Sequence, residues 1–237
     1  MSKTILQIFL LCLFSLIVKA QGAESSFDKA LYKLKVTKDY DGAIDDFTSE
    51  IERFPTQKLN YLYRADAKAA LSYYFLAILD YDKVIELDSK NEYAYLMRGV
   101  CKTMLGIHYS AIDDFTKILT FNKESRNAYY YRAKVKESID ENHSAIFDYT
   151  QAIKINPYDT QSYTDRGYAK FKLEHYKDAL LDFDQAITID PTLAQTYYNR
   201  GWTKYALNDK NGGCEDFSKA ADLGKKEAYQ DLKDNCL

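Results

Sequence analysis

The chain has 237 residues, of which 32 are lysine or arginine and 35 are aspartate or glutamate, so its formal net charge is −3. The basic residues are spread at regular intervals among acidic ones, and no basic patch is visible. A mildly acidic chain without such a patch is not expected to bind nucleic acid.

Residues 1–20 differ from the rest of the chain and are typical of a secretory signal peptide. Lys3 gives a positive start, an apolar run follows as far as Val18, and Ala20 ends a stretch that resembles a cleavage site. The run is short for a membrane span, which favours a removable signal over the alternative, an uncleaved N-terminal anchor. Cleavage would remove Lys3 and Lys19, two positive charges and no acids, so the net charge would change from −3 to −5. We therefore expect an exported protein, in a periplasm, at a cell surface or secreted, with no integral membrane segment after cleavage.

A spacing of 34 residues organises the rest of the sequence. In each copy a tyrosine lies three residues before an arginine, a small residue directly after it, a lysine four after, an aspartate sixteen after and an aromatic residue seventeen after. A fixed spacing in this range is the signature of stacked repeats. The five arginines that mark the copies are Arg64, Arg98, Arg132, Arg166 and Arg200.

Each copy predicts two antiparallel helices. In the copy at 160–193, Tyr163, Gly167 and Phe171 follow helical spacing and share one side of a first helix. Ala179 and Phe183 have the same spacing in a second helix. The short polar stretch between the two halves predicts a tight turn, so the unit is expected to be a helical hairpin.

The residue types at the repeated positions explain how the hairpins would pack. The small residues Gly167 and Ala179 let two backbones approach, and the aromatic rings of Tyr163 and Phe183 fill the space beside them. Asp159 is expected to cap the first helix of its copy. A single hairpin cannot bury its apolar faces alone, so the copies must stack.

The ends of the array are less regular than its middle. An earlier copy keeps Ala43, Asp46, Phe47 and Pro55 at the expected positions but has Ala30 where the arginine should be. A terminal repeat is expected to be atypical because one face meets solvent. The tail, residues 225–237, predicts an amphipathic helix that caps the last hairpin. The predicted repeats are 24–57, 58–91, 92–125, 126–159, 160–193 and 194–227.

This pattern resembles the tetratricopeptide repeat (TPR), a 34-residue helix pair with aromatic, small, small, aromatic, small and proline positions in that order. The resemblance covers residues 24–227. It implies an all-α fold, a right-handed superhelical solenoid of antiparallel helix pairs with about six repeats and a C-terminal capping helix. The closing proline is missing from three copies, which is expected to make those junctions less regular, at Ser89, Lys123 and Lys225.

Three cysteines would remain after signal cleavage. Cys101 occupies a helix position that is small in the other copies, so it is interpreted as a buried packing residue. Cys214 and Cys236 lie eleven residues before and after Lys225, where the last hairpin is predicted to turn. Antiparallel helices would bring the two to the same level, where an exported protein could form a disulfide. Helix rotation could instead point the two side chains apart.

The repeated arginine and aspartate are better explained by packing than by ligand binding. They occur once per copy along the whole array, and a buried arginine without a partner would be costly. The sequence leaves two pairings open, Arg98 with Asp114 in the same copy or Arg98 with Asp80 in the preceding one. The repeated lysines are interpreted as a solvated row whose stems lie along the surface.

No enzymatic activity, cofactor or metal ion is expected. The three histidines, His108, His143 and His175, fall in the turns between helices, and none has metal-ligand spacing with another histidine, cysteine or acid. The sequence also contains no glycine-rich phosphate loop and no nucleophile motif.

The TPR resemblance implies that the first helix of each pair lines a concave groove that binds extended peptides or partner helices. In the last three complete copies the groove positions hold mainly aromatic and amide side chains. An equally weighted alternative is that several of these aromatic residues pack between neighbouring repeats. The lysines and asparagines with which some family members bind a terminal carboxylate are absent from these positions, so that class of partner is not expected. The predicted groove residues are Asn127, Tyr130, Lys134, Gln161, Thr164, Tyr168, Gln195, Tyr198, Trp202 and Tyr205.

The sequence therefore predicts an exported protein–protein interaction module that holds a peptide or helix of a partner protein in its groove. The alternative is a structural scaffold or self-associating envelope protein that acts through an edge or its convex face. The partner's identity and the oligomeric state stay open at this point.

Overall fold

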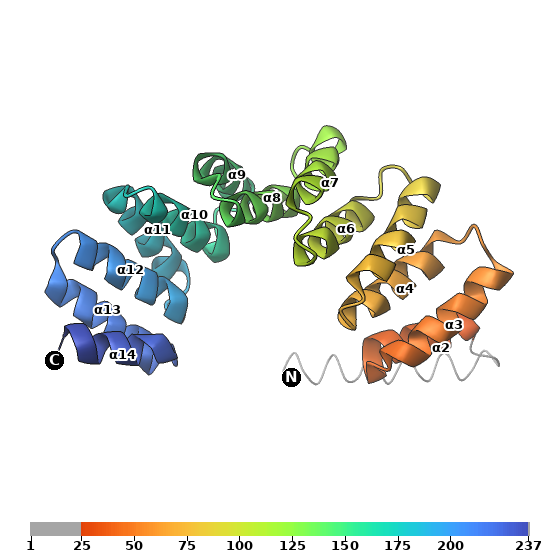
Figure 1. Cartoon of the computed structure of the whole chain (residues 1–237), viewed down its shortest axis with the longest axis horizontal. Helices are drawn as coiled ribbons and strands as arrows, with labels where there is room; N and C mark the ends of the chain where they lie inside the picture. Colours follow the sequence, from red (N-terminus) through yellow and green to blue (C-terminus); the bar gives the residue numbers. More distant parts are fainter. Residues whose placement is uncertain (1–24, 237) are drawn as a thin grey trace, which may run out of the picture. The chain divides into compact units, whose positions relative to one another are not determined.

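The computed structural model describes residues 25–236 (Figure 1). The predicted signal peptide and the first residue of the predicted array lie outside these residues. The chain divides into two compact units, and the described parts are 25–105 in unit 1 and 106–236 in unit 2.

Both units consist of helices joined by short turns, and successive helices within a unit alternate in direction (Figure 1). Unit 1 contains α2 (Ser26–Tyr32), the π-helical segment η1 (Lys33–Thr37), α3 (Tyr40–Arg53), α4 (Lys58–Ala70), α5 (Tyr74–Leu87) and α6 (Glu92–Met104). Unit 2 contains α7 (His108–Phe121), α8 (Arg126–Ser138), α9 (Asn142–Ile155), α10 (Thr160–Lys172), α11 (Tyr176–Ile189), α12 (Ala194–Ala206), α13 (Lys210–Asp222) and α14 (Lys226–Asn235). Over residues 25–236, none of the helices combines the length and the apolar character that a membrane crossing requires.

The predicted all-α array of antiparallel helix pairs is confirmed. Within the units, α4 pairs with α5, α8 with α9, α10 with α11, and α12 with α13. As predicted, the side chain of Asp159 caps α10 by accepting a hydrogen bond from the backbone N–H of Ser162. The earliest copy departs from the others because its first half is a short helix followed by a π-helical segment.

Small residues bring the two helices of a hairpin together, as the sequence indicated. The ring of Phe183 on α11 is fully buried and lies against Gly167 of α10. A β-carbon on Gly167 would lie 2.7 Å from Phe183 Cε1. In the next hairpin a β-carbon on Gly201 would lie 2.7 Å from Phe217 Cε1 and 3.1 Å from the backbone oxygen of Gly213, so in these two hairpins a β-carbon fits only if neighbouring atoms shift.

One arginine per repeat connects three parts of the structure. Arg166 donates from Nε and Nη2 to the two carboxylate oxygens of Asp182 on α11, at 2.9 and 2.6 Å. Its Nη1 donates to Thr150 Oγ1 on α9, in the preceding hairpin, at 3.0 Å. Its guanidinium also lies over the ring of Tyr163, 5.5 Å from the centroid. We call this arrangement the arginine clamp.

A lysine completes each clamp. Lys170 Nζ lies 2.8 Å from Asp182 Oδ2, and Asp182 is only 3% exposed. One buried carboxylate is therefore held by two cations. The prediction that the repeated lysines form a solvated row is therefore wrong for these four, because they lie beside a carboxylate that burial leaves in need of positive charge. The four sets are Arg64, Lys68 and Asp80; Arg132, Lys136 and Asp148; Arg166, Lys170 and Asp182; and Arg200, Lys204 and Asp216.

These four clamps also decide between the two pairings that the sequence left open. Each arginine binds the aspartate sixteen residues later, on the second helix of its own repeat. Asp80 thus belongs to Arg64 of its own repeat. Arg98 reaches Asp82 of the preceding repeat at 2.5 Å, as the clamp arginines reach back to the preceding hairpin. The bidentate geometry suits the planar guanidinium, which a lysine could not replace.

The turn between the two helices of a repeat contains a residue in the left-handed conformation. It lies eight residues after each repeat arginine, just after the first helix has ended. Only Gly106 is of the residue type that adopts this backbone without steric cost. The φ angles are 62° at Ser72, 74° at Gly106, 60° at Asp140, 61° at Glu174 and 64° at Asn208.

The C-terminal helix is joined covalently to the last hairpin. Cys214 on α13 and Cys236 at the end of α14 form a disulfide, with their Cα atoms 5.7 Å apart. Helix α14 packs on α13 and buries Ala228. Cys101 is a free, buried cysteine within unit 1.

The clamp predicts a large loss of stability when its carboxylate is removed. Asp182→Ala would leave Arg166 and Lys170 beside an apolar site, so we expect a loss of about 3–5 kcal/mol in the free energy of unfolding. Urea unfolding followed by circular dichroism measures this loss. The matched control is Asp184→Ala, because Asp184 pairs with Arg200 but its side chain is 56% exposed, and such a pair contributes less than about 1 kcal/mol. Equal losses in the two variants would contradict the clamp.

The turn geometry predicts a stabilising substitution. Glu174→Gly removes the β-carbon that crowds a backbone with φ of 61°. We therefore expect a higher unfolding temperature and a free energy of unfolding that is larger by up to about 1 kcal/mol. Gly106→Ala, at the equivalent position, is expected to lose about 1 kcal/mol. A β-carbon on Gly106 would meet no atom within 4 Å, so the loss of stability in Gly106→Ala would come from backbone strain and not from a steric clash with neighbouring residues. A destabilised Glu174→Gly protein would show that this turn is not strained.

Candidate binding surface

The ten predicted groove residues come from three helices of unit 2. They lie on α8, α10 and α12, the first helices of three successive repeats, and α10 contacts both of the other two. Within each helix they lie three and seven residues after the first of the set, and in α12 a fourth lies ten residues after it, which places them along one stripe. We call this surface of unit 2 the first-helix face.

A buried aspartate joins three of these residues. Tyr130 donates its hydroxyl to Asp165 Oδ2 at 3.0 Å, and Lys134 Nζ lies 3.5 Å from the same oxygen. Gln161 donates its amide nitrogen to both carboxylate oxygens at 3.2 Å. Asp165 therefore links α8 to α10. This role could not be predicted from the repeat pattern, because the equivalent position holds a tyrosine, methionine or asparagine in the other copies, at Tyr63, Met97, Tyr131 and Asn199.

A second tyrosine and carboxylate continue the pattern at the C-terminal end. Tyr198 on α12 donates its hydroxyl to Asp231 Oδ2 on α14 at 2.7 Å. Lys225 Nζ lies over the ring of Tyr198, 5.3 Å from the centroid. Burial, together with the negative charge of Asp231, raises the pKa of the Tyr198 hydroxyl, so it stays protonated and continues to donate. In both places a tyrosine on one first helix binds an acid on the next.

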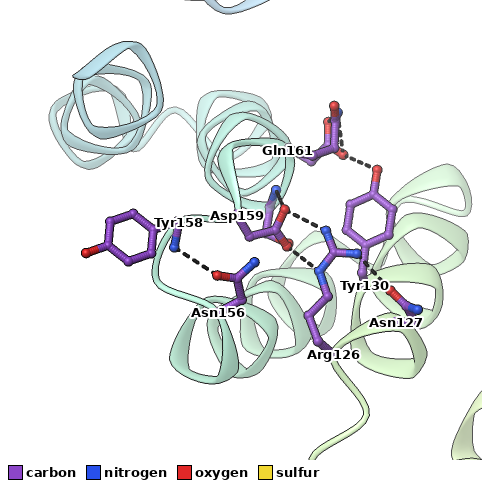
Figure 2. A network of polar contacts seen from close by, with 9 residues as sticks. Arg126, Asn127, Tyr130, Asn156, Tyr158, Asp159 and Gln161 are labelled. Atoms are coloured by element: carbon purple, nitrogen blue, oxygen red, sulfur yellow. Dashed lines mark hydrogen bonds and ion pairs between the residues drawn. The ribbon is translucent and has the colours of Figure 1, made fainter. Parts of the chain in front are cut away.

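An ion pair at the start of α8 supports the same face. Arg126 donates from Nε and Nη2 to the two oxygens of Asp159, the cap of α10, at 2.7 and 2.6 Å, and from Nη1 to Asn127 at 2.8 Å (Figure 2). Its guanidinium lies 5.1 Å from the centroid of the Tyr130 ring. Burial raises the pKa of the Asp159 carboxyl, but hydrogen bonds from Arg126 and Ser162 outweigh it and lower the pKa overall.

The aromatic residues of the face partly pack against the second helices. The Trp202 ring lies 5.1 Å from the buried ring of Phe217 on α13, and Tyr198 lies 5.9 Å from it. Tyr205 meets Trp202 edge-on at 5.8 Å. Packing therefore fixes the orientation of these rings, in line with the interpretation that several of them pack within the array. The rings are half-buried and keep part of their surface exposed.

The structure changes the predicted set at one position. Thr164 is only 5% exposed, and its hydroxyl is 2.8 Å from that of Thr196, so it packs between α10 and α12. A short side chain at this position lets the two helices approach, and it has no surface to offer a partner. Tyr168 is 39% exposed. Of the others, Asn127, Gln161 and Gln195 are exposed, and Tyr130, Lys134, Tyr198, Trp202 and Tyr205 are half-buried.

The acids on this face pair with tyrosine, lysine and amide groups. Glu137, for example, accepts a hydrogen bond from the Tyr149 hydroxyl at 2.7 Å, and burial raises the pKa of its carboxyl. Within residues 25–236, histidines, cysteines and acids do not gather in groups of three that could hold a metal ion. The arrangement offers aromatic rings and amides for non-covalent contact.

Comparisons with known proteins agree with this architecture. Residues 160–193 match the family model of the tetratricopeptide repeat. No curated protein sequence matches the chain.

Several solved structures share the fold. A structure of YrrB, described as a TPR protein with an unusual peptide-binding site, is 25% identical with a TM-score of 0.64, over 79% of this chain and 97% of that one. MamA from Desulfovibrio magneticus RS-1 is 18% identical with a TM-score of 0.66, over 73% and 97%. The Cut9–Hcn1 assembly of the APC/C is 17% identical with a TM-score of 0.75, over 96% of this chain and 46% of that one.

The 34-residue register, the stacked helix pairs and the matched repeat at 160–193 together lead to one assignment. Residues 160–193 form a tetratricopeptide repeat, and the chain has the fold of the solved TPR structure that it resembles.

Proposed function

We propose that this TPR protein is an exported interaction module that holds an extended peptide or a helix of a partner protein on the first-helix face of unit 2. The observation that carries the proposal is the combination of fixed and exposed groups on that face. Aromatic rings held by packing and hydrogen bonds lie beside exposed amides, so little side-chain freedom would be lost on binding.

The chemistry of the face suits a peptide. Trp202 and Tyr168 provide apolar rings with polar atoms, the residue types that dominate binding energy at interfaces. The exposed amides of Asn127, Gln161 and Gln195 can donate to and accept from peptide groups. Their positions repeat every 34 residues, so a partner could meet an amide at each successive helix. The peptide-binding site described for YrrB adds support.

Two features support the proposed export. The first twenty residues have the pattern of a secretory signal. The disulfide between Cys214 and Cys236 would persist in an oxidising compartment and would be reduced in a cytosol.

A second candidate function, scaffolding by self-association, is favoured by one apolar patch. On α5 the side chains of Phe75, Leu76 and Leu79 are 63%, 45% and 50% exposed, and their spacing places them on one side of the helix. Light scattering on residues 21–237 tests this candidate. A monomer at all accessible concentrations would exclude it, and a dimer that Leu79→Glu dissociates would favour it.

The peptide-binding proposal is tested with a double variant, Tyr168→Ala with Trp202→Ala. The bait is residues 21–237, and captured proteins from an envelope extract are quantified by mass spectrometry. We expect at least one protein to bind the unchanged chain and to lose about tenfold or more in affinity with the variant, because both aromatic anchors are removed.

The control is Phe147→Ala, which removes an exposed aromatic ring from α9, a second helix of the same unit. Its captured proteins should match those of the unchanged chain. A further variant, Gln161→Ala with Gln195→Ala, spares the aromatic packing and should also weaken capture. Identical captured proteins from all four baits would refute the proposal.

A further inference from the structure

Unit 1 contains a cavity of about 490 Å³ that lies outside the predicted groove residues. It is lined by residues of η1, α4 and α6, and it contacts the first residues of α3 and α5. Its volume is within the range of pockets that take a small ligand or one large side chain. Much of the lining is apolar, with Leu34, Met97, Val100 and Met104 among the contributors.

A single acid, Asp66 on α4, lines this apolar pocket. Its Oδ1 accepts hydrogen bonds from the hydroxyls of Tyr81 at 2.8 Å and Tyr93 at 3.1 Å. Its other oxygen, Oδ2, accepts no hydrogen bond from any residue in 25–236, and it is not among the buried polar atoms that lack a partner, so it is open to solvent in the pocket. Burial raises the pKa of the Asp66 carboxyl, and the two tyrosine hydrogen bonds and the charge of Lys35 oppose this effect.

The other titratable groups of the pocket do not neutralise Asp66 directly. Lys35 is exposed, and its Nζ lies over the ring of Tyr63, 5.4 Å from the centroid. In the part of the chain that the structure describes, Lys35 forms no ion pair with Asp66. Burial raises the pKa of the Cys101 thiol to about 11, so it is neutral. Tyr40, Tyr74 and Tyr93 add aromatic rings to the lining.

The contrast with the arginine clamps identifies what the pocket lacks. In a clamp, a carboxylate such as Asp80 is held by both Arg64 and Lys68 at 2.6 and 2.7 Å. Asp66 has two neutral donors and no cation at contact distance. Asp66 is half-buried, and a carboxylate in such a setting with an unpaired oxygen is stabilised most by a positively charged donor.

We infer that this pocket takes a long cationic side chain, lysine or arginine, from a partner protein. The methylene stem lies against Met97, Val100 and Met104, and the charged head binds Asp66 Oδ2. Long cationic side chains pair an apolar stem with a charged end, which matches this lining. A purely apolar occupant would leave Oδ2 without water or a donor, and an acidic one would be repelled.

This site goes beyond the proposed function. It uses residues of unit 1 only, so it can stand if the first-helix face of unit 2 binds nothing. Variants of Tyr168 and Trp202 are expected to leave it unchanged.

The test uses synthetic peptides of one sequence that differ at a single position. N-acetylated, C-amidated Gly-Ala-Leu-Xaa-Leu-Ala-Gly is prepared with lysine, arginine, norleucine, citrulline or glutamate at Xaa. Binding to residues 21–237 is followed by chemical shifts in NMR spectra. We expect the lysine and arginine peptides to bind about tenfold or more tightly than their neutral counterparts, norleucine and citrulline. This comparison needs no protein variant, so it does not depend on any variant folding.

Three variants locate the effect. Asp66→Asn keeps a carbonyl oxygen for Tyr81 and Tyr93, so it should retain the fold and lose only the preference for cationic peptides. Val100→Trp fills the pocket and should abolish binding of lysine and norleucine peptides alike. Glu86→Gln, which changes an exposed acid on α5 that does not line the pocket, is the matched control and should change nothing.

Three results would overturn the inference. The first is equal affinity for lysine and norleucine peptides. The second is an unchanged preference in Asp66→Asn. The third is the absence of binding by all five peptides.

Discussion

The structure depends on one buried carboxylate per repeat that is shared by two cations. In each of the four clamps an arginine on the first helix and a lysine one turn later hold an aspartate on the second helix. The same arginine reaches back to the preceding hairpin, so it sets both the angle within a repeat and the contact between repeats. Neither cation nor carboxylate can be buried alone without a large cost, which explains why all three positions recur together.

The sequence predicted the features whose residue types recur in successive repeats, and it missed the features whose residue types differ from one repeat to the next. The helix pairs, the close approach at Gly167 and the cap at Asp159 follow from repeated columns of residue types. The left-handed turn position was missed because Ser72, Asp140, Glu174 and Asn208 share a backbone angle and no side-chain chemistry. The acids that organise the surfaces were missed for a related reason, since each occurs in one repeat only. Thr164 was misplaced because small size serves packing as well as exposure.

The two proposed surfaces differ in how their acids are satisfied. On the first-helix face of unit 2, Asp165 already binds a tyrosine, a lysine and a glutamine, so its charge holds the scaffold and the rings beside it are free for contact. In unit 1, Asp66 binds two tyrosine hydroxyls through one oxygen and leaves the other open to an apolar pocket. A satisfied carboxylate positions its neighbours, and an unsatisfied one can recognise a partner.

Hydrogen exchange of Arg166→Met measured by mass spectrometry tests the central claim most directly. Methionine keeps the apolar stem and removes both links of the clamp, to Asp182 on α11 and to Thr150 on α9. We expect faster exchange in α9, α10 and α11, which span two neighbouring hairpins, while unit 1 keeps its protection. Faster exchange confined to α10, or no change at all, would contradict the claim that one arginine joins consecutive hairpins.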